Sequence, residues 1–207
     1  MNGKYILIAV LLFCGVQTLT AQIGVEQYCY LWKNGNTTQV QLVHYQTSKN
    51  FYVEARYNYE EQNTGAIYIG KTFSSEDKLS YSITPIVGGV FGKFKGGSAG
   101  FNGTAEYHKI YFSTQTQYTF SAQDETINYF FSWSELGYEI RHWVYAGAAS
   151  QQTNIFKTKG YLEPGVVVGF VFGNWTFPLY AFSPMSDKQY YVFGVNLNLG
   201  LRNKVTR

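Results

Sequence analysis

One segment near the end of the chain constrains the fold more than any other. Residues 190–201 read Tyr-Tyr-Val-Phe-Gly-Val-Asn-Leu-Asn-Leu-Gly-Leu. Because successive side chains of a β-strand point to opposite faces, the odd-numbered residues form an apolar face. The opposite face is mostly small or amide, and it includes Asn196 and Asn198. This pattern is typical of a strand with lipid on one side and a polar lumen on the other.

A second alternating segment, residues 51–60, carries charge on one face. Apolar residues, with Tyr59 among them, fall on one side, and glutamate, arginine and asparagine fall on the other. An arginine facing lipid near the bilayer midplane costs roughly 2–4 kcal/mol, so the charged face is expected to point inward. The similar segment at residues 99–107 adds one more acidic side chain. The predicted lumen-lining residues are Glu54, Arg56, Asn58, Glu60, Glu106, Asn196 and Asn198.

The number and spacing of such segments predict a closed barrel. We expect about twelve strands after residue 21 and no helix there. Alternate connections are long, as at residues 153–164, and the intervening ones are short, as at residues 108–109 and 173–174. Outer-membrane barrels have this asymmetry, and an even strand number returns the chain to its starting side. The predicted fold is therefore all-β: a closed, antiparallel, up-and-down transmembrane β-barrel, in which the first strand pairs with the last.

One predicted strand does not keep its alternation. Around residues 133–136, Trp-Ser-Glu-Leu, the apolar residues switch from one face to the other. Either a β-bulge shifts the phase there, or an aromatic side chain turns inward.

The start of the chain resembles an export signal. Lys4 is followed by an apolar run over residues 5–16, and then by polar and small residues before Gln22. We predict a signal peptide at residues 1–21 and a single β-barrel domain at residues 22–207. This barrel would lie in the outer membrane of a Gram-negative cell. Cys29 is the only cysteine after the predicted signal, so an internal disulfide is not possible.

Three stretches carry a resemblance to known proteins. They are residues 51–60, residues 83–92 (Ile-Thr-Pro-Ile-Val-Gly-Gly-Val-Phe-Gly) and residues 131–136 (Phe-Ser-Trp-Ser-Glu-Leu). Together they resemble an uncharacterised family of exported, outer-membrane-like β-barrel proteins over about residues 50–199. The wider resemblance is to twelve-stranded outer-membrane barrels, some of which are narrow solute channels and one a phospholipase. The resemblance implies the barrel fold and supplies no catalytic residues.

The charged face at Glu54, Arg56 and Glu60 has two interpretations. A ring of charges could select solutes in a pore. Alternatively, an inward arginine in a poorly solvated interior needs carboxylate partners, which would make the group an ion-paired plug. We favour the plug.

Few residues suggest other chemistry. The three histidines, His44, His108 and His142, are interpreted as surface or interfacial residues, because the last two fall at short turns and no nucleophile motif accompanies them. We expect no catalytic activity, metal or cofactor. The chain has 16 Lys and Arg against 13 Asp and Glu, a balance that does not favour nucleic acid as a partner.

The favoured function is an outer-membrane barrel that is a narrow channel for small solutes or a structural membrane protein. The alternative is a secreted or periplasmic β-sandwich that binds a ligand, with the aromatic stripes as its core. An outer-membrane lipid-modifying enzyme ranks below both. The expected partners are outer-membrane lipid and an unidentified small solute. Basic loops at residues 93–98 and 157–160 could contact lipopolysaccharide or simply be solvated.

Overall fold

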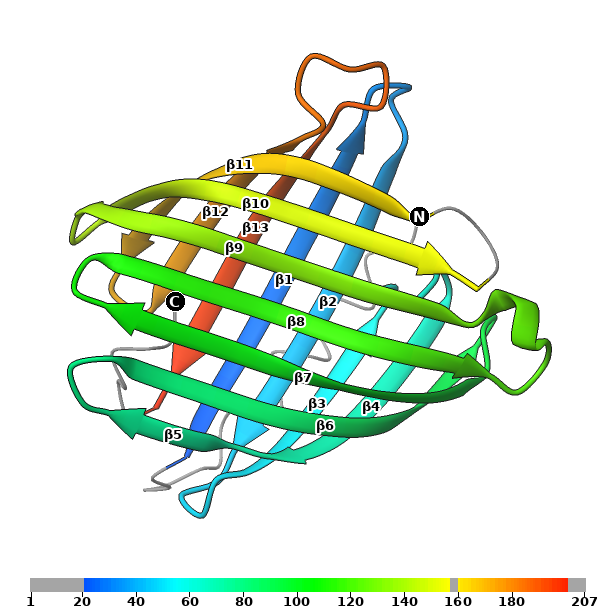
Figure 1. Cartoon of the computed structure of the whole chain (residues 1–207), viewed down its shortest axis with the longest axis horizontal. Coiled ribbons are helices and arrows are strands. Elements are labelled where there is room, and N and C mark those ends of the chain that lie inside the picture. Colours follow the sequence, from blue (N-terminus) through cyan, green and yellow to red (C-terminus); the bar gives the residue numbers. More distant parts are fainter. Residues whose placement is uncertain (1–20, 157–159, 201–207) are drawn as a thin grey trace, which may run out of the picture.

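The described chain forms a single antiparallel sheet that closes on itself (Figure 1). The computed structural model describes residues 21–156 and 160–200, so the predicted signal peptide lies outside the described residues except for Ala21. The strands are β1 (Gln22–Trp32), β2 (Thr37–Gln46), β3 (Phe51–Tyr57), β4 (Thr64–Lys71), β5 (Phe73–Glu76), β6 (Ser80–Gly92), β7 (Gly96–Tyr107), β8 (Ile110–Ser121), β9 (Tyr129–Arg141), β10 (Val144–Ile155), β11 (Tyr161–Phe172), β12 (Trp175–Phe182) and β13 (Tyr190–Leu199).

β4 and β5 together make one of twelve barrel strands. Both pair with β6, and they do so in a single register, with Gly70 opposite Ile86 and Phe73 opposite Ile83. The interruption at Thr72 lies beside Pro85, which has no backbone N–H to donate to the neighbouring strand. The predicted strand number is therefore confirmed.

Pairing of β1 with β13 closes the barrel. The two strands run antiparallel from Ile23 opposite Leu199 to Trp32 opposite Tyr190. β4 also pairs with β6, so the ladder is continuous around the barrel. In hydrocarbon an unpaired backbone group costs several kcal/mol, and closure removes both sheet edges. The alternative of a β-sandwich is wrong, since its two separate sheets would each keep their edges.

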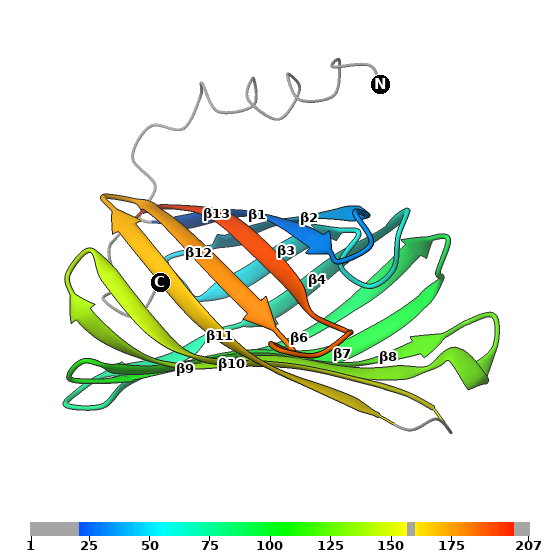
Figure 2. The same ribbon diagram turned by 90° about the horizontal axis from the view of Figure 1, so that it is seen from above.

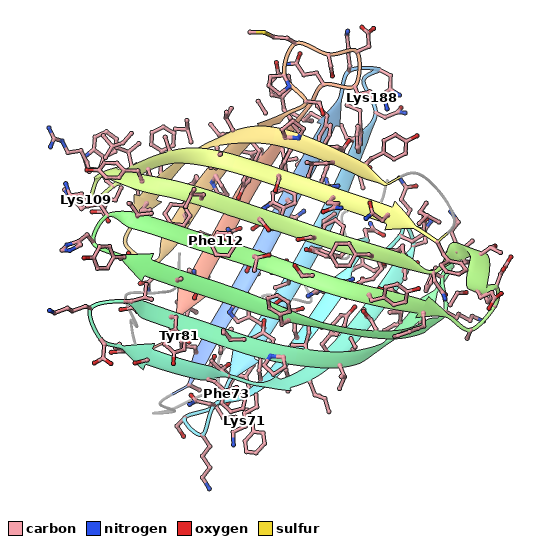
Figure 3. All side chains as sticks on the ribbon, viewed as in Figure 1. Lys71, Phe73, Tyr81, Lys109, Phe112 and Lys188 are labelled. Carbon is pink, nitrogen blue, oxygen red and sulfur yellow. The ribbon has the colours of Figure 1, made fainter. Side chains whose placement is uncertain are left out.

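The outer face of the barrel is apolar. Along β13, Tyr191 and Phe193 are exposed whereas Tyr190, Val192 and Asn196 are buried, as the alternation predicts. The other strands expose large apolar side chains in the same way, and Figure 3 labels Phe73, Tyr81 and Phe112 among them. Such an exterior suits acyl chains rather than water. The predicted transmembrane β-barrel is thus confirmed.

The connections differ in length at the two ends of the barrel. At one end the strands are joined by tight turns, such as residues 108–109, 142–143 and 173–174. At the other end the connections are longer, and residues 122–128 include the short 3-10 helix η1 (Glu125–Ile127). No helix among the described residues is long and apolar enough to cross a membrane.

Two residues near the end of β3 differ from the prediction. β3 ends at Tyr57 because Asn58 takes a left-handed backbone conformation, with φ of 58°. Asn58 closes the turn: its amide donates to the backbone oxygen of Gln39, and its Oδ1 accepts the N–H of Asn63. The break in alternation also turns Tyr59 into the lumen, where it contacts Arg56. The expected outward position of Tyr59 is wrong.

The irregular segment of β9 contains no bulge. β8 and β9 keep one register from Ile110 opposite Tyr138 to Thr119 opposite Tyr129. The apolar phase changes because Trp133 points inward, where its ring nitrogen donates to Glu135 at 3.0 Å.

On the outer face of β8 and β9, beside this segment, hydroxyl side chains replace apolar ones and form a patch. Thr114 and Ser134 lie 2.8 Å apart between their oxygens, and Thr116 and Ser132 lie 2.9 Å apart. The patch lies between apolar outward residues toward both ends of β8, Phe112 and Phe120.

Candidate functional site: the barrel lumen

Arg56 is the centre of a polar network that crosses the lumen. Figure 2 shows β1–β4 on one side of the barrel and β6–β9 on the other. The guanidinium of Arg56, on β3, is fully buried; its Nε donates to Glu54, and its Nη1 lies 3.5 Å from Glu60 Oε1. Nη1 also donates to Gln117 Oε1 on β8 at 2.5 Å. The contact therefore ties opposite walls together.

Two tyrosine rings hold the same guanidinium from its faces. The Arg56 Cζ atom lies 4.4 Å from the ring centroid of Tyr59 and 4.5 Å from that of Tyr68. The Tyr59 hydroxyl donates to Gln115 on β8 at 2.5 Å. A cation enclosed between aromatic rings is stabilised by their π faces, most strongly when it is desolvated. Arg56 is therefore fixed in orientation, as a plug requires.

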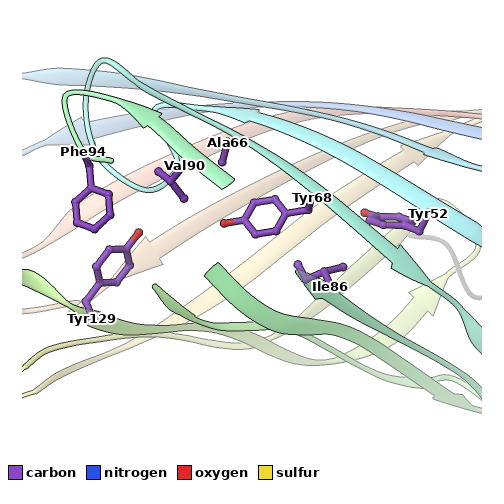
Figure 4. Close-up of a cluster of buried hydrophobic side chains, with 7 residues drawn as sticks. All are labelled: Tyr52, Ala66, Tyr68, Ile86, Val90, Phe94 and Tyr129. Atoms are coloured by element: carbon purple, nitrogen blue, oxygen red, sulfur yellow. The ribbon is translucent and has the colours of Figure 1, made fainter. Parts of the chain in front are cut away.

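An apolar cluster adjoins the network (Figure 4). Phe94 and Tyr129 approach edge to face, with ring centroids 5.9 Å apart, across the space between the walls. The Tyr129 hydroxyl donates to the backbone oxygen of Glu60 at 3.3 Å. The remaining members come from β3, β4 and β6: Tyr52, Ala66, Tyr68, Ile86 and Val90.

A second aromatic cluster fills the lumen beneath β10–β13. Glu135 lies at its edge and accepts the Tyr180 hydroxyl at 2.6 Å and the Trp133 ring N–H at 3.0 Å. Trp133 packs edge to face on Tyr180 and on Phe182, with centroids 5.0 Å away in both cases. Much of this chain's tyrosine is therefore interior, together with Trp133, a feature that composition alone did not reveal.

A cavity of about 200 Å³, lined by both polar and aromatic side chains, occupies the lumen beside these clusters. Gln22, Gln46 and Glu76 are among its lining residues, and each lies near the short-turn end of its strand. Tyr59 and Gln115 also line it and are in contact with the Arg56 network. The cavity thus extends from the short-turn end to the plug.

The charges on the cavity wall are acidic. Glu26, Glu76 and Glu135 line it, whereas no lysine or arginine of the described chain does. His44 is the only histidine on this wall; its Nδ1 lies 3.8 Å from Glu26 Oε1, and its ring stacks on Tyr52 with centroids 5.6 Å apart. The expectation that His44 is a surface or interfacial residue is wrong, because the even-numbered face of β2 points into the lumen.

Two amide oxygens on this wall lack hydrogen-bond partners in the described part of the chain. Asn196 donates through Nδ2 to the Tyr28 hydroxyl at 3.2 Å, and that hydroxyl donates to Glu26 at 2.8 Å. The Oδ1 atoms of Asn196 and Asn102 are buried and have no hydrogen-bond partner within residues 21–156 and 160–200. Both residues line the cavity. Buried acceptors are normally satisfied, so these two oxygens are exceptions that lack a donor.

Comparison with known proteins identifies the type of barrel. No protein-family model matches the sequence, and no curated protein does. The KdgM porin aligns with a TM-score of 0.61 and 11% identity, over 84% of this chain and 98% of the porin. The barrel is similar in fold to the KdgM porin. The KdgM porin in complex with disordered oligogalacturonate aligns with a TM-score of 0.60 and 11% identity, over 85% of this chain and 98% of that one.

The similarity in fold to the KdgM porin, together with the apolar exterior, makes this chain a twelve-stranded transmembrane β-barrel. The resemblance drawn from residues 51–60, 83–92 and 131–136 is confirmed in its fold. At 11% identity the similarity shows the fold alone, so the lumen must be interpreted from this chain's own residues.

The predicted lumen residues fall in different places. Glu54, Arg56 and Glu60 come together in the central network. Asn196 and Asn198 line the cavity. Glu106 is on the face of β7 that also carries Asn102 and Thr104, nearer the short-turn end. Asn58 lies apart, in the turn after β3.

Sequence reasoning missed the other polar members of the lumen. Glu26 lies on a strand whose alternation is mixed, and Gln117 carries no charge that would mark it as a partner of Arg56. Only the closed barrel brings Gln117 to Arg56. The signal that could have found Glu26 is an isolated carboxylate two residues from a tyrosine, Tyr28, on the same face of its strand. No group of three His, Cys, Asp or Glu side chains in the described part of the chain could hold a metal ion.

Proposed function

We propose that the protein is a narrow channel for small solutes rather than an enzyme, and that the Arg56 network constricts it. The observation that carries this proposal is the cavity inside a closed barrel, which ends against the plug. Its wall offers carboxylates, amides, hydroxyls and aromatic rings, a lining that suits hydrated or hydrogen-bonding solutes. The fold shared with the KdgM porin supports the same class of function.

A structural membrane protein with a closed lumen is the second candidate. It is favoured by the contacts that cross the lumen, since Arg56 reaches Gln117 and Tyr59 reaches Gln115 on the opposite wall. Conduction in this case would require the network to separate.

Single-channel recording in planar bilayers separates the two. We expect wild type to pass small current steps and Arg56→Ala to pass steps severalfold larger, because the substitution removes the side chain that joins β3 to β8. Arg141→Ala is the matched control, since Arg141 is exposed at the short-turn end of β9. Absence of current in both wild type and Arg56→Ala would reject the channel and leave the structural role.

This proposal implies outer-membrane lipid around the apolar exterior and a small solute in the cavity. In the basic loop at residues 93–98, Lys93 forms an ion pair with Glu61, and 3.3 Å separates its Nζ from Glu61 Oε1. Lys95 of the same loop remains a candidate for contact with lipopolysaccharide. Lys157 and Lys159 lie outside the described residues.

A further inference from the structure

We infer that the lumen cavity binds small organic cations, such as amines, in preference to neutral or acidic solutes. The inference builds on the proposed channel function and names its class of solute. It rests on three independent properties of the cavity wall: its charge, its unsatisfied acceptors and its aromatic surface.

The charge of the wall favours a cation. Glu26, Glu76 and Glu135 line the cavity, and no lysine or arginine of the described chain lies on it. The only guanidinium nearby, that of Arg56, is enclosed by Glu54, Glu60 and two tyrosine rings behind the wall. The one basic side chain on the wall within the described chain is His44, whose Nδ1 lies 3.8 Å from Glu26 Oε1, so the three carboxylates outnumber it. An acidic solute would therefore meet mostly like charge, and like-charge contact disfavours binding.

The unsatisfied atoms of the wall are acceptors, which need a donor. Asn196 is 8% exposed, and its Oδ1 has no partner in the described part of the chain. The Oδ1 atom of Asn102, on β7, likewise has no partner in the described part of the chain, and Asn102 also lines the cavity. An ammonium group donates three hydrogen bonds and accepts none, so it matches a wall of amide and carboxylate oxygens.

Aromatic rings supply the remaining surface. Tyr28, Trp133 and Tyr180 line the cavity, with Tyr28 and Tyr180 each in ring contact with Trp133. The hydroxyls of Tyr28 and Tyr180 are hydrogen-bonded to Glu26 and Glu135, which fixes the rings beside the carboxylates. Aromatic faces next to carboxylates attract cations through the ring quadrupole as well as through charge.

The inferred preference for cations is opposite in charge to the ligand named for a structural neighbour. One KdgM porin structure is a complex with oligogalacturonate, whose sugar units carry carboxylates. The acidic wall found here does not suit such a ligand. Two barrels of one fold would thus differ in the sign of charge that their lumens accept.

Three probes of equal length test the inference: 1,4-diaminobutane, 1,4-butanediol and succinate. They are titrated into the refolded full chain in lipid nanodiscs, with binding followed by calorimetry and by tryptophan fluorescence, to which Trp133 contributes. We expect the diamine to bind and the diol and succinate to bind at least tenfold more weakly. Glu135→Gln and Glu26→Gln should each weaken diamine binding severalfold, and the exposed loop variant Glu125→Gln should not.

The outcomes keep the two proposals apart. Diamine binding that is no tighter than diol or succinate binding, or that survives the double variant Glu26→Gln, Glu135→Gln, would overturn the cation site. That result leaves the channel proposal intact, because channel activity is judged from bilayer current. A channel that conducts but prefers chloride to potassium in a KCl gradient would likewise overturn the cation preference alone.

Discussion

Arg56 Nη1 and Gln117 Oε1 lie 2.5 Å apart, and their hydrogen bond joins β3 to β8 through the interior of the barrel. The two residues are 61 positions apart in the chain and belong to strands that are not neighbours in the sheet. Every ladder contact of this barrel is between adjacent strands. The Arg56 contact therefore adds a constraint of a different kind, since it fixes the distance between opposite walls.

Removing the charge of Glu54 tests how much the network stabilises the barrel. Glu54 accepts hydrogen bonds from Arg56, Tyr52 and Asn102, and its side chain is fully buried. Glu54→Gln leaves buried Arg56 with only its longer, 3.5 Å ion-pair contact to Glu60. Breaking a buried ion pair from one side is strongly destabilising, and we expect this variant to lower the free energy of unfolding by about 3 kcal/mol. Urea unfolding in lipid vesicles measures the change.

The control for this variant is Glu61→Gln. Glu61 pairs with Lys93 at 3.3 Å, and both side chains are well exposed. An exposed pair contributes about 0–1 kcal/mol, so this variant should unfold nearly as wild type does. If both variants lost a similar amount of unfolding free energy, the buried Glu54–Arg56 pair would stabilise the barrel no more than the exposed Glu61–Lys93 pair does.

Alanine is expected to be destabilising at one of two adjacent glycines on β6 and harmless at the other. A Cβ atom at Gly88 would lie 2.6 Å from Cδ1 of Tyr68 and 2.3 Å from the backbone oxygen of Ile67, whereas one at Gly89 would meet nothing within 4 Å. We expect Gly88→Ala to displace Tyr68 and loosen the enclosure of Arg56. It should lower the temperature at which the unboiled protein loses its fast gel mobility by several degrees. Gly89→Ala should leave that temperature unchanged.

The barrel can be predicted well from the sequence because side chains along its strands alternate between the two faces with a period of two. Alternation assigns the outward and inward faces of β13, and the lengths of the connections establish the direction of each strand. Neither property requires knowledge of which residues meet across the lumen. The fold and its strand number could therefore be predicted from the alternating segments and connections along the chain, and the inward position of Glu54 and Arg56 from residues 51–60.

The interior could not be predicted in the same way. Trp133 lies on a strand with apolar residues on both faces, so alternation does not say which side is the lumen. Tyr59 turns inward because Asn58 takes a positive φ, which no alternating pattern reports. The partners that Arg56 and Glu135 find on other strands, Gln117 and Tyr180, are set by the shape of the closed barrel, and that shape follows from pairing and side-chain volume together.

The hydroxyl patch on β8 and β9 predicts a measurable coupling. Thr116 Oγ1 and Ser132 Oγ lie 2.9 Å apart on the outer face of the barrel. Hydrogen bonds between polar side chains in membranes contribute about 0.6 kcal/mol on average. We expect a double-mutant cycle of Thr116→Val and Ser132→Ala to give a coupling energy of that order, from urea unfolding in vesicles. The double variant should be no less stable than Ser132→Ala alone, since it leaves no hydroxyl of this pair without its partner.

Cysteine labelling tests which faces meet lipid and water. Cys29 pairs in register with Phe193, and β1 turns its even-numbered residues, Tyr28 and Tyr30, inward. Cys29 therefore faces the acyl chains. We expect a charged, water-soluble maleimide to leave Cys29 unlabelled in nanodiscs and to label Ser113→Cys in a Cys29→Ser protein, because Ser113 lines the cavity. Labelling of Cys29 at the rate found in urea would contradict this arrangement.

A pair of aspartate substitutions on β13 tests the same facing through assembly. Val195 lies on the lipid-facing side of the strand, in the row of Tyr191 and Phe193, whereas Asn198 lines the cavity. A carboxylate facing the bilayer interior is destabilising, but one in a polar lumen can be hydrated. We expect Val195→Asp to abolish or strongly reduce the heat-modifiable form in refolding assays and Asn198→Asp to assemble nearly as wild type does. Equal yields of the two variants would mean that β13 does not present Val195 to lipid, and the inward position of Asn196 and Asn198 would fall with it.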